Sequence, residues 1–492
     1  MPKKYLAVIW IALIFSYNCF AQTSRYWSLN FASEPSILAG AVVGGYAENQ
    51  AIYYNPAIIA ETKSDNVGLS GEVVAMDFYK VKNGFGQDFD FRFSQLNVVP
   101  SFVSFFLKSK NQPKLSYQLA LLTRDRMNMD ITESRTGKTD VFLDQPRTES
   151  FSALYETYIM YQDVWVGGGA AYELNEQFSI GISTFLSVKR FSDKLTKSLN
   201  IYSRNDLDSM ELYSNRHEIS RTDLINFRLQ TKVGLQYKFP KCRFGLNFTL
   251  PSILFGGQGK RYREFGFTRY TDGDIESIPP FLIVDSQNEL PADYKDPLSI
   301  SLGFNYAPNP ELDMLGLSIE YFHEIPVYRM VEAERTLDTG IAEFDSDPNV
   351  DFMSIWYGAR RLVNVSIGYR KYINKELTLL GGFRTDFDYL KNVDFSGTSN
   401  EYNNFIKLQW DVFHLTGGAR INISRHRFVV GAQYSLSREK NLNPLIDFNP
   451  SPDLKNSQLP TALPNSTQAE LKYNGIAVFF GFIFNFLDKA EK

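Results

Sequence analysis

The chain has 492 residues, with 40 Phe and 28 Tyr but only 4 His. Its formal net charge is −4, so it has no basic field that would attract a nucleic acid, and we expect no such partner. The length would allow two or three soluble domains, yet no linker or shift in composition divides the sequence. Strand patterns run almost from end to end, which favours one large all-β domain.

The first 21 residues have the three parts of a secretory signal peptide. Lys3 and Lys4 give a positive start, Tyr5–Phe15 an apolar centre, and Ala21 a small residue before the expected cleavage. The apolar centre is too short to cross a membrane as a helix. We therefore expect residues 1–21 to be a signal peptide.

Beyond it, apolar residues recur at a period of two. The last predicted strand carries on one face Val478, Phe480, Phe482, Phe484 and Phe486. Leu362–Arg370 and Phe227–Tyr237 repeat the pattern, with polar or glycine residues on the opposite face. This dyad repeat is typical of a transmembrane β-barrel, apolar toward lipid and polar toward the lumen.

We expect fourteen antiparallel strands in residues 66–492, because bacterial single-chain barrels have even strand numbers. The expected strands are Val67–Tyr79, Leu96–Lys108, Leu115–Arg126, Phe151–Leu174, Phe178–Arg190, Leu224–Lys238, Phe244–Leu254, Leu298–Ala307, Met314–His323, Leu362–Ile373, Leu377–Asp388, Ile406–Ile421, Arg427–Leu436 and Leu471–Leu487. Short connections alternate with long ones, among them 191–223, 256–297, 324–361 and 439–470. Short periplasmic turns against long outer loops fit a barrel in the bacterial outer membrane.

Residues 22–65 precede the first strand and do not alternate. Their centre is rich in small and apolar residues, which suits a compact plug in the lumen; a flexible periplasmic tail is the alternative. Here the chain resembles the FadL/Toluene-X family of outer-membrane transporters. The matching residues are Gly40, Gly44, Gly45, Ala47–Ala51 and Asn55, Pro56 and Ala57, with further likeness at Asn97–Ser101 and Ala170–Gly181.

The resemblance implies an N-terminal hatch inside a fourteen-stranded barrel and passive uptake of a hydrophobic molecule, such as a long-chain fatty acid or an aromatic hydrocarbon. It implies no cofactor and no enzymatic activity. The expected partners are membrane lipid, the hydrophobic ligand and the barrel-assembly machinery, with the protein itself a monomer. Two other functions stay open: a protein-interaction or secretion component of the same build, and a general polar porin.

Pro100 falls inside a predicted strand, where it must leave one ladder bond unmade. It marks either a harmless bulge or a lateral opening between neighbouring strands. Gly167–Gly169 indicates another weak or bulged point, and Pro251 one near the outer rim. If the registers hold, the apolar residues that face the lumen are Val74, Met76, Leu122, Phe185, Leu380, Phe479 and Ile483.

Charged residues also fall on the lumen face. Arg384, Asp386 and Asp388 share one row, with Arg370 on the next strand; they either brace the wall or hold a ligand carboxylate. No histidine or cysteine spacing suggests a metal site, and no nucleophile or phosphate-loop motif is present. Acidic stretches at 272–274 and 345–351 are solvated loops or calcium ligands.

Overall fold

The computed structural model describes residues 25–31, 33–45, 49–61, 66–109, 111–139, 149–204, 210–271, 281–308, 313–334, 353–395, 409–423, 426–445 and 468–485. The predicted signal peptide and both acidic stretches lie outside these residues.

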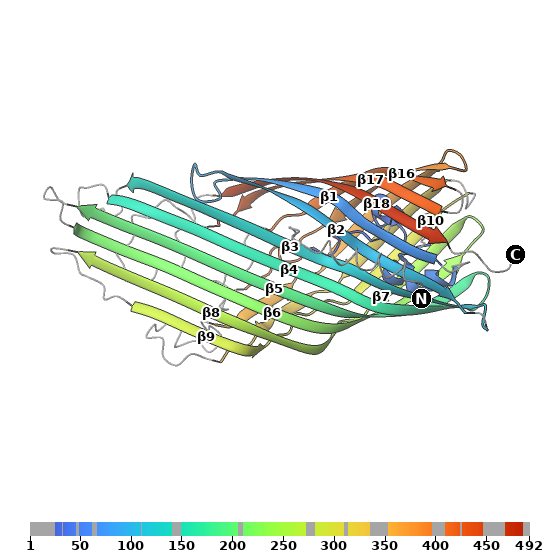
Figure 1. Cartoon of the computed structure of the whole chain (residues 1–492), viewed down its shortest axis with the longest axis horizontal. Helices are drawn as coiled ribbons and strands as arrows, with labels where there is room; N and C mark the ends of the chain where they lie inside the picture. Colours follow the sequence, from blue (N-terminus) through green and yellow to red (C-terminus); the bar gives the residue numbers. More distant parts are fainter. Residues whose placement is uncertain are drawn as a thin grey trace, which may run out of the picture.

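Fourteen antiparallel strands form a closed ring, as predicted (Figure 1). In ring order they are β1 (Asn66–Lys82), β2 (Phe91–Lys108), β3 (Leu115–Thr139), β4 (Glu149–Glu173), β5 (Phe178–Arg204), β6 (Met210–Lys238), β7 (Cys242–Thr249), β10 (Ser299–Tyr306), β11 (Met314–Phe322), β14 (Leu362–Tyr372), β15 (Leu377–Asp386), β16 (Val412–Ile423), β17 (His426–Leu442) and β18 (Ala469–Asn485). The first strand pairs with the last, from Asn66↔Asn485 to Lys82↔Glu470. Closure leaves no sheet edge for lipid to meet.

The two faces of the wall differ as the alternation predicts. On β14, Val363 and Ile367 are 43% and 45% exposed and point outward, whereas Asn364 and Ser366 are fully buried toward the lumen. Nearly every strand of the ring carries such an outward apolar row, so the wall is suited to hydrocarbon and the barrel belongs in the outer membrane. No helix among the described residues is long and apolar enough to cross a membrane.

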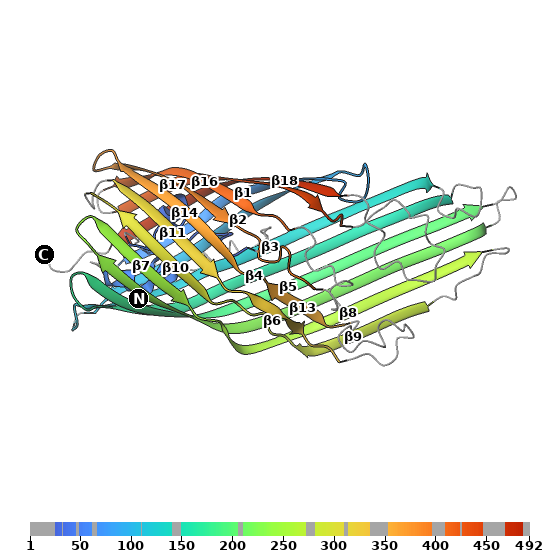
Figure 2. The same ribbon diagram turned by 180° about the vertical axis from the view of Figure 1, so that it is seen from behind.

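One side of the barrel extends far beyond a bilayer (Figure 2). Strands β3 to β6 have 25 to 29 residues, although about ten suffice to cross. Two further strands, β8 (Ile253–Thr271) and β9 (Phe281–Pro291), continue this sheet beside the outer half of β6. The prediction of loops over 191–223 and 256–297 was therefore partly wrong, because these strands continue without an outward apolar row while residues such as Phe191 and Leu195 stay buried on the inward face.

Three smaller expectations also need correction. A second pair outside the ring, β12 (Ile325–Val331) and β13 (Ile355–Ala359), forms its own small sheet within the predicted 324–361 loop. Gly167–Gly169 is not a bulge, since β4 pairs without a shift on both sides there; Phe185 packs where a Gly167 side chain would stand. Met76 points outward at 44% exposure, because β1 changes register at Glu72–Val74.

The other described apolar positions, Leu122, Phe185, Leu380, Phe479 and Ile483, are buried as predicted; the side chain of Val74 is not described. Pro251 lies in the break between β7 and β8.

The described part of residues 25–61, hereafter the N-terminal segment, lies within the ring near the chain ends (Figure 1). It contains α2 (Ser33–Ile37), α3 (Ala51–Tyr54) and the 3₁₀ helix η1 (Pro56–Glu61). Nearly all of its described side chains are buried.

Candidate functional site

The N-terminal segment rests on a row of glycines that we call the glycine belt. These residues face inward on nine neighbouring strands, and a side chain at any of them would strike the segment or a neighbouring residue at contact distance: Gly181, Gly234, Gly245, Gly303, Gly316, Gly368, Gly382, Gly418 and Gly431. Several are direct cross-strand partners, such as Gly245 with Gly303 and Gly368 with Gly382. The belt lets the backbone of the segment approach the wall more closely than any side chain would allow.

Three glycines of the N-terminal segment, in the stretch that resembles the FadL/Toluene-X family, also contribute to this close approach. Gly40 and Gly45 have φ values of +82° and +139°, which favour glycine. Gly44 lies against the wall, where an added Cβ would stand 3.0 Å from the backbone nitrogen of Asn305.

Asn55, Pro56 and Ala57 form a buried turn beside Val43. The Asn55 amide donates to the carbonyls of Val43 (3.0 Å) and Leu235 (3.1 Å) and accepts from the Ala57 backbone (3.1 Å). One side chain therefore ties together two parts of the segment and the wall.

Above the belt, the segment and the wall share an apolar cluster. Its wall members include Phe102, Phe106, Leu122, Trp165 and Phe185, and its segment members include Phe31, Ile52, Tyr53 and Ile59. The Trp165 ring lies 5.3 Å from Phe185 and 5.9 Å from Tyr53. These residues form an apolar surface in the lumen, with the charged groups of Lys232 and Arg124 lying 4.3 and 5.8 Å from the Tyr53 ring centre.

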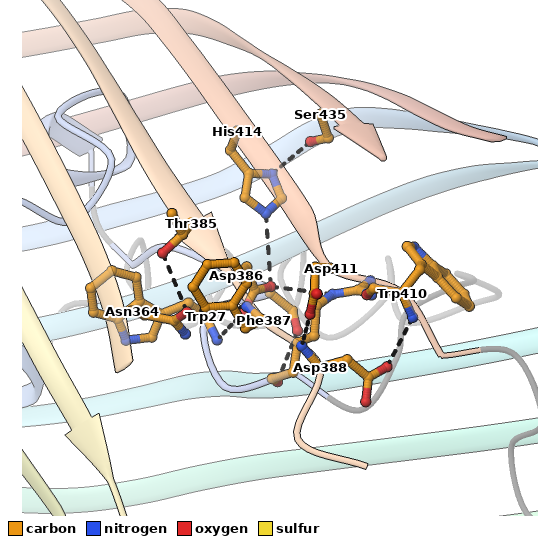
Figure 3. A network of polar contacts seen from close by, with 12 residues as sticks. Trp27, Asn364, Thr385, Asp386, Phe387, Asp388, Trp410, Asp411, His414 and Ser435 are labelled. Atoms are coloured by element: carbon orange, nitrogen blue, oxygen red, sulfur yellow. Dashed lines mark hydrogen bonds and ion pairs between the residues drawn. The ribbon is translucent and has the colours of Figure 1, made fainter. Parts of the chain in front are cut away.

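Asp386, which the sequence placed in a lumen row, anchors the start of the segment (Figure 3). Its carboxylate accepts a hydrogen bond from the Trp27 backbone (3.0 Å) and lies 3.4 Å from Nε of Arg25, with both charged side chains buried. Arg25 also donates to the carbonyl of Trp410 (2.9 Å). A buried charge pair of this kind is costly to break on one side only.

Asp388 lies just past the end of β15 and binds backbone groups rather than a charged side chain (Figure 3). Its carboxylate accepts hydrogen bonds from the backbones of Leu390 (2.8 Å) and Trp410 (3.2 Å). Arg384 donates to the carbonyl of Ser28 (3.2 Å). These contacts brace the loops and the segment.

Arg370 does not lie with the other three residues. Arg370 on β14 pairs with Leu380 on β15, which comes four residues before Arg384 in the sequence. Arg370 also lies near Glu34 of α2. Arg420 forms a 2.9 Å ion pair with Glu34. Burial alone would raise the pKa of Glu34, but the charges of Arg420 and Arg370 outweigh it and hold the pKa below its usual value of 4.5.

His414 was not singled out by the sequence. Its Nδ1 lies 2.7 Å from the Ser435 hydroxyl, and its Nε2 lies 3.7 Å from Asp386, on three neighbouring strands (Figure 3). The second distance is too long for a hydrogen bond, and His414 and Ser435 are 1% and 3% exposed. His414 therefore links β16 to β17 by a hydrogen bond and lies close to Asp386 of β15.

The wall is incomplete beside the apolar cluster. Pairing between β2 and β3 ends at Phe102↔Leu122, and in the described residues no pairing joins the outer halves of the two strands. Pro100 lies two residues from this end, where the β1–β2 register also shifts. On the other side, β3 has a bulge at Arg124. We call this interruption the β2–β3 seam; that Pro100 marks a harmless bulge or a lateral opening stays a prediction.

At the outer mouth, aromatic side chains form a second apolar cluster. Tyr26 stacks on Phe322 and Tyr389 with ring centres 4.3 and 4.5 Å apart. Tyr294 and Tyr357 belong to the same cluster, with their ring centres 4.9 Å apart. Most of these residues come from loops, where the sequence has no period that would place them together.

Comparisons with known proteins agree with this architecture. No family model and no curated protein matches the sequence. The Pseudomonas putida toluene transporter TodX matches at a TM-score of 0.50 and 13% identity, over 93% of this chain and 99% of that one. A TodX monoaromatic hydrocarbon channel lacking S2 and S3 matches at 0.53 with the same identity and coverage. A Pseudomonas aeruginosa FadL homologue matches at 0.49 and 11% identity, over 96% and 100%. This chain is thus an outer-membrane barrel with the fold of the TodX channel.

Proposed function

We propose that this protein is a passive outer-membrane channel for hydrophobic small molecules, of the class of long-chain fatty acids or aromatic hydrocarbons. The molecule enters at the outer mouth, passes the lumenal apolar cluster and leaves sideways through the β2–β3 seam. The N-terminal segment blocks the straight path to the periplasm.

The observation that carries this proposal is the position of the seam. Strand pairing stops at Phe102↔Leu122, and these two residues are also members of the lumenal apolar cluster. This gap in the described wall therefore adjoins the apolar cluster, and the Arg124 guanidinium lies beside it, 5.8 Å from the Tyr53 ring centre and 5.9 Å from that of Trp165. Each buried methylene contributes about 0.8 kcal/mol, so such a surface extracts an alkyl chain from water.

The similar structures support the same substrate class through their names, a toluene transporter and a hydrocarbon channel. A general polar porin is disfavoured because the N-terminal segment occupies the lumen. A protein-interaction role has one observation in its favour, the long sheet of β3 to β6 that projects beyond the bilayer.

The test is uptake of a radiolabelled long-chain fatty acid and of toluene into proteoliposomes. Leu122→Asn places a polar group in the route at a buried position, and Leu121→Asn places the same group on the lipid face of the same strand. We expect the first variant to lose most uptake and the second to keep it. Equal uptake by both variants, or no saturable uptake by the native protein, would refute the proposal.

A further inference from the structure

Just beyond the apolar rows that face lipid, the outward face of β5, β6 and β8 becomes basic. On β5, the outward residues alternate from Ile182, which is 51% exposed, to Arg190 and Lys194, which are also exposed. Arg221 of β6 lies directly opposite Lys194, and Lys260 of β8 pairs with the residue two positions from Arg221. These exposed cations therefore share one face of the sheet, and we call them the basic patch: Arg190, Lys194, Arg221 and Lys260.

The basic patch stands at the level of the outer lipid headgroups. The outward residues of β6 are mostly apolar from Tyr237, beside the short turn, to Ile225. This stretch of strand covers about 40 Å, or about 28 Å of bilayer height at a tilt of about 45°, close to the hydrocarbon thickness of about 30 Å. Arg221 lies beyond Ile225, about 9 Å higher, within the headgroup layer.

The charges of the patch are unpaired, unlike those on the inward face of the same strands. On that inward face, Lys197 and Arg263 form ion pairs with Glu218 at 3.1 and 3.0 Å. Within the described part of the chain, no ion pair joins a cation of the basic patch to an acid. Lys194 and Arg221 are moreover direct cross-strand partners, and like charges in that position repel. A bound anion removes this repulsion.

Two tyrosines flank the centre of the patch on the neighbouring strands. The Arg221 guanidinium lies 5.8 Å from the ring centre of Tyr262 on β8, and the Lys194 ammonium lies 5.8 Å from that of Tyr158 on β4. Such contacts hold a cation at an exposed site without neutralising it. Tyrosine also gathers at membrane–water interfaces, which agrees with the level of the patch in the bilayer.

The acids on this face do not neutralise the patch. One acid, Asp223, lies among the four cations. Three others lie at the edge of the patch: Asp130, Glu156 and Glu264. The carboxylate of Glu264 already accepts a hydrogen bond from the Tyr262 hydroxyl and lies 3.0 Å from Nε2 of His217. The four cations therefore leave an excess of positive charge for a ligand.

We propose that the basic patch binds the headgroup of a phosphorylated glycolipid of the outer leaflet, whose acyl chains lie along the apolar rows of β5 and β6. Guanidinium and ammonium groups bind phosphate oxygens through charge-assisted hydrogen bonds. The patch extends over three strands, about 10 Å by 13 Å, so a sugar headgroup with two phosphates reaches more of its charges than a phospholipid with one. This site lies on the outer surface and does not rest on the proposed transport function.

The test is native mass spectrometry of the detergent-purified protein with bisphosphorylated lipid A and with the same lipid A after removal of both phosphates. We expect preferential retention of one bisphosphorylated molecule. Each cation near a membrane surface strengthens the binding of an anionic lipid about fivefold, so Lys194→Gln and Arg221→Gln should each weaken retention about fivefold. Asp223→Asn should strengthen it by a similar factor, a gain that a folding defect cannot produce.

The matched control is Lys375→Gln, which removes an exposed lysine from a short turn at the other end of the barrel. It should retain lipid A as the native protein does, and heat-modifiable migration on gels verifies that each variant folds. Equal retention of the two forms of lipid A by the native protein would overturn the proposal. Equal losses in Lys194→Gln and Lys375→Gln would do so too, as would retention of phosphatidylglycerol equal to that of lipid A.

Discussion

Gly382→Ala is the sharpest test of how the N-terminal segment is seated. An added Cβ at Gly382 would stand 2.8 Å from the carbonyl carbon of Leu38 and 2.9 Å from Cβ of Ala39. Carbon atoms pack at about 3.5–4.0 Å, so the segment must move by roughly 1 Å. Overpacking of this kind costs about 2 kcal/mol, which lowers the docking equilibrium of the segment about 30-fold.

The neighbouring glycine provides the control. Gly381→Ala adds the same methyl group to the same strand, where the nearest atom is the Thr416 carbonyl oxygen at 3.4 Å. In planar bilayers, we expect frequent conductance bursts from Gly382→Ala and the quiet trace of the native protein from Gly381→Ala. If both variants stay equally quiet while folding normally, the segment is not held by close contact with the belt.

Three further predictions concern the segment. Asp386→Asn leaves Arg25 buried without its counter-charge, at a cost of about 3–5 kcal/mol, and should expose the segment to protease. The control is Asp313→Asn, which removes the half-exposed ion pair with Lys371 and should leave the segment protected. The pKa of Glu34 is lowered in the folded protein, so its ionised carboxylate stabilises the docked segment fully above pH 4.5, and this stabilisation is lost as the pH falls further. We therefore expect the conductance of the native protein to rise below pH 4.5. Glu34→Gln should remove this pH dependence. Deletion of residues 33–61 should give steady conductance, and an unchanged trace would show that the segment does not close the lumen.

The barrel was predictable because lipid imposes one strict rule on every strand. Outward residues such as Val363 and Ile367 must be apolar, which makes the period of two visible in the sequence. Beyond the bilayer this rule lapses, and the outward faces of β5 and β6 become largely polar, whereas Phe191, Leu195 and Ile201 of β5 stay buried on the inward face. The outer halves therefore lose the outward apolar row that marks a strand, although they pair continuously from Phe178↔Tyr237 to Ser203↔Leu212.

The candidate site was predictable only in part. Asp386 and Arg384 stood out because charge on a barrel strand must face inward, but their partners Arg25 and Ser28 come from a segment without periodicity. Arg370 was grouped with them because it lies on the neighbouring strand, and register places it lower. The glycine belt did leave a signal, since Gly382 and Gly418 each stand in a glycine doublet, and the other members of the two doublets, Gly381 and Gly417, pair on adjacent strands. A single glycine such as Gly303 cannot be recognised as a belt residue from the sequence.

The most direct test of the transport proposal is a paired flux measurement in proteoliposomes. Fatty acid and a small neutral sugar are presented together to the native protein at equal concentration. The filled lumen and the apolar route predict saturable entry of the fatty acid and negligible entry of the sugar. Sugar entry at a rate equal to that of the fatty acid would contradict the account, since it requires an open aqueous pore.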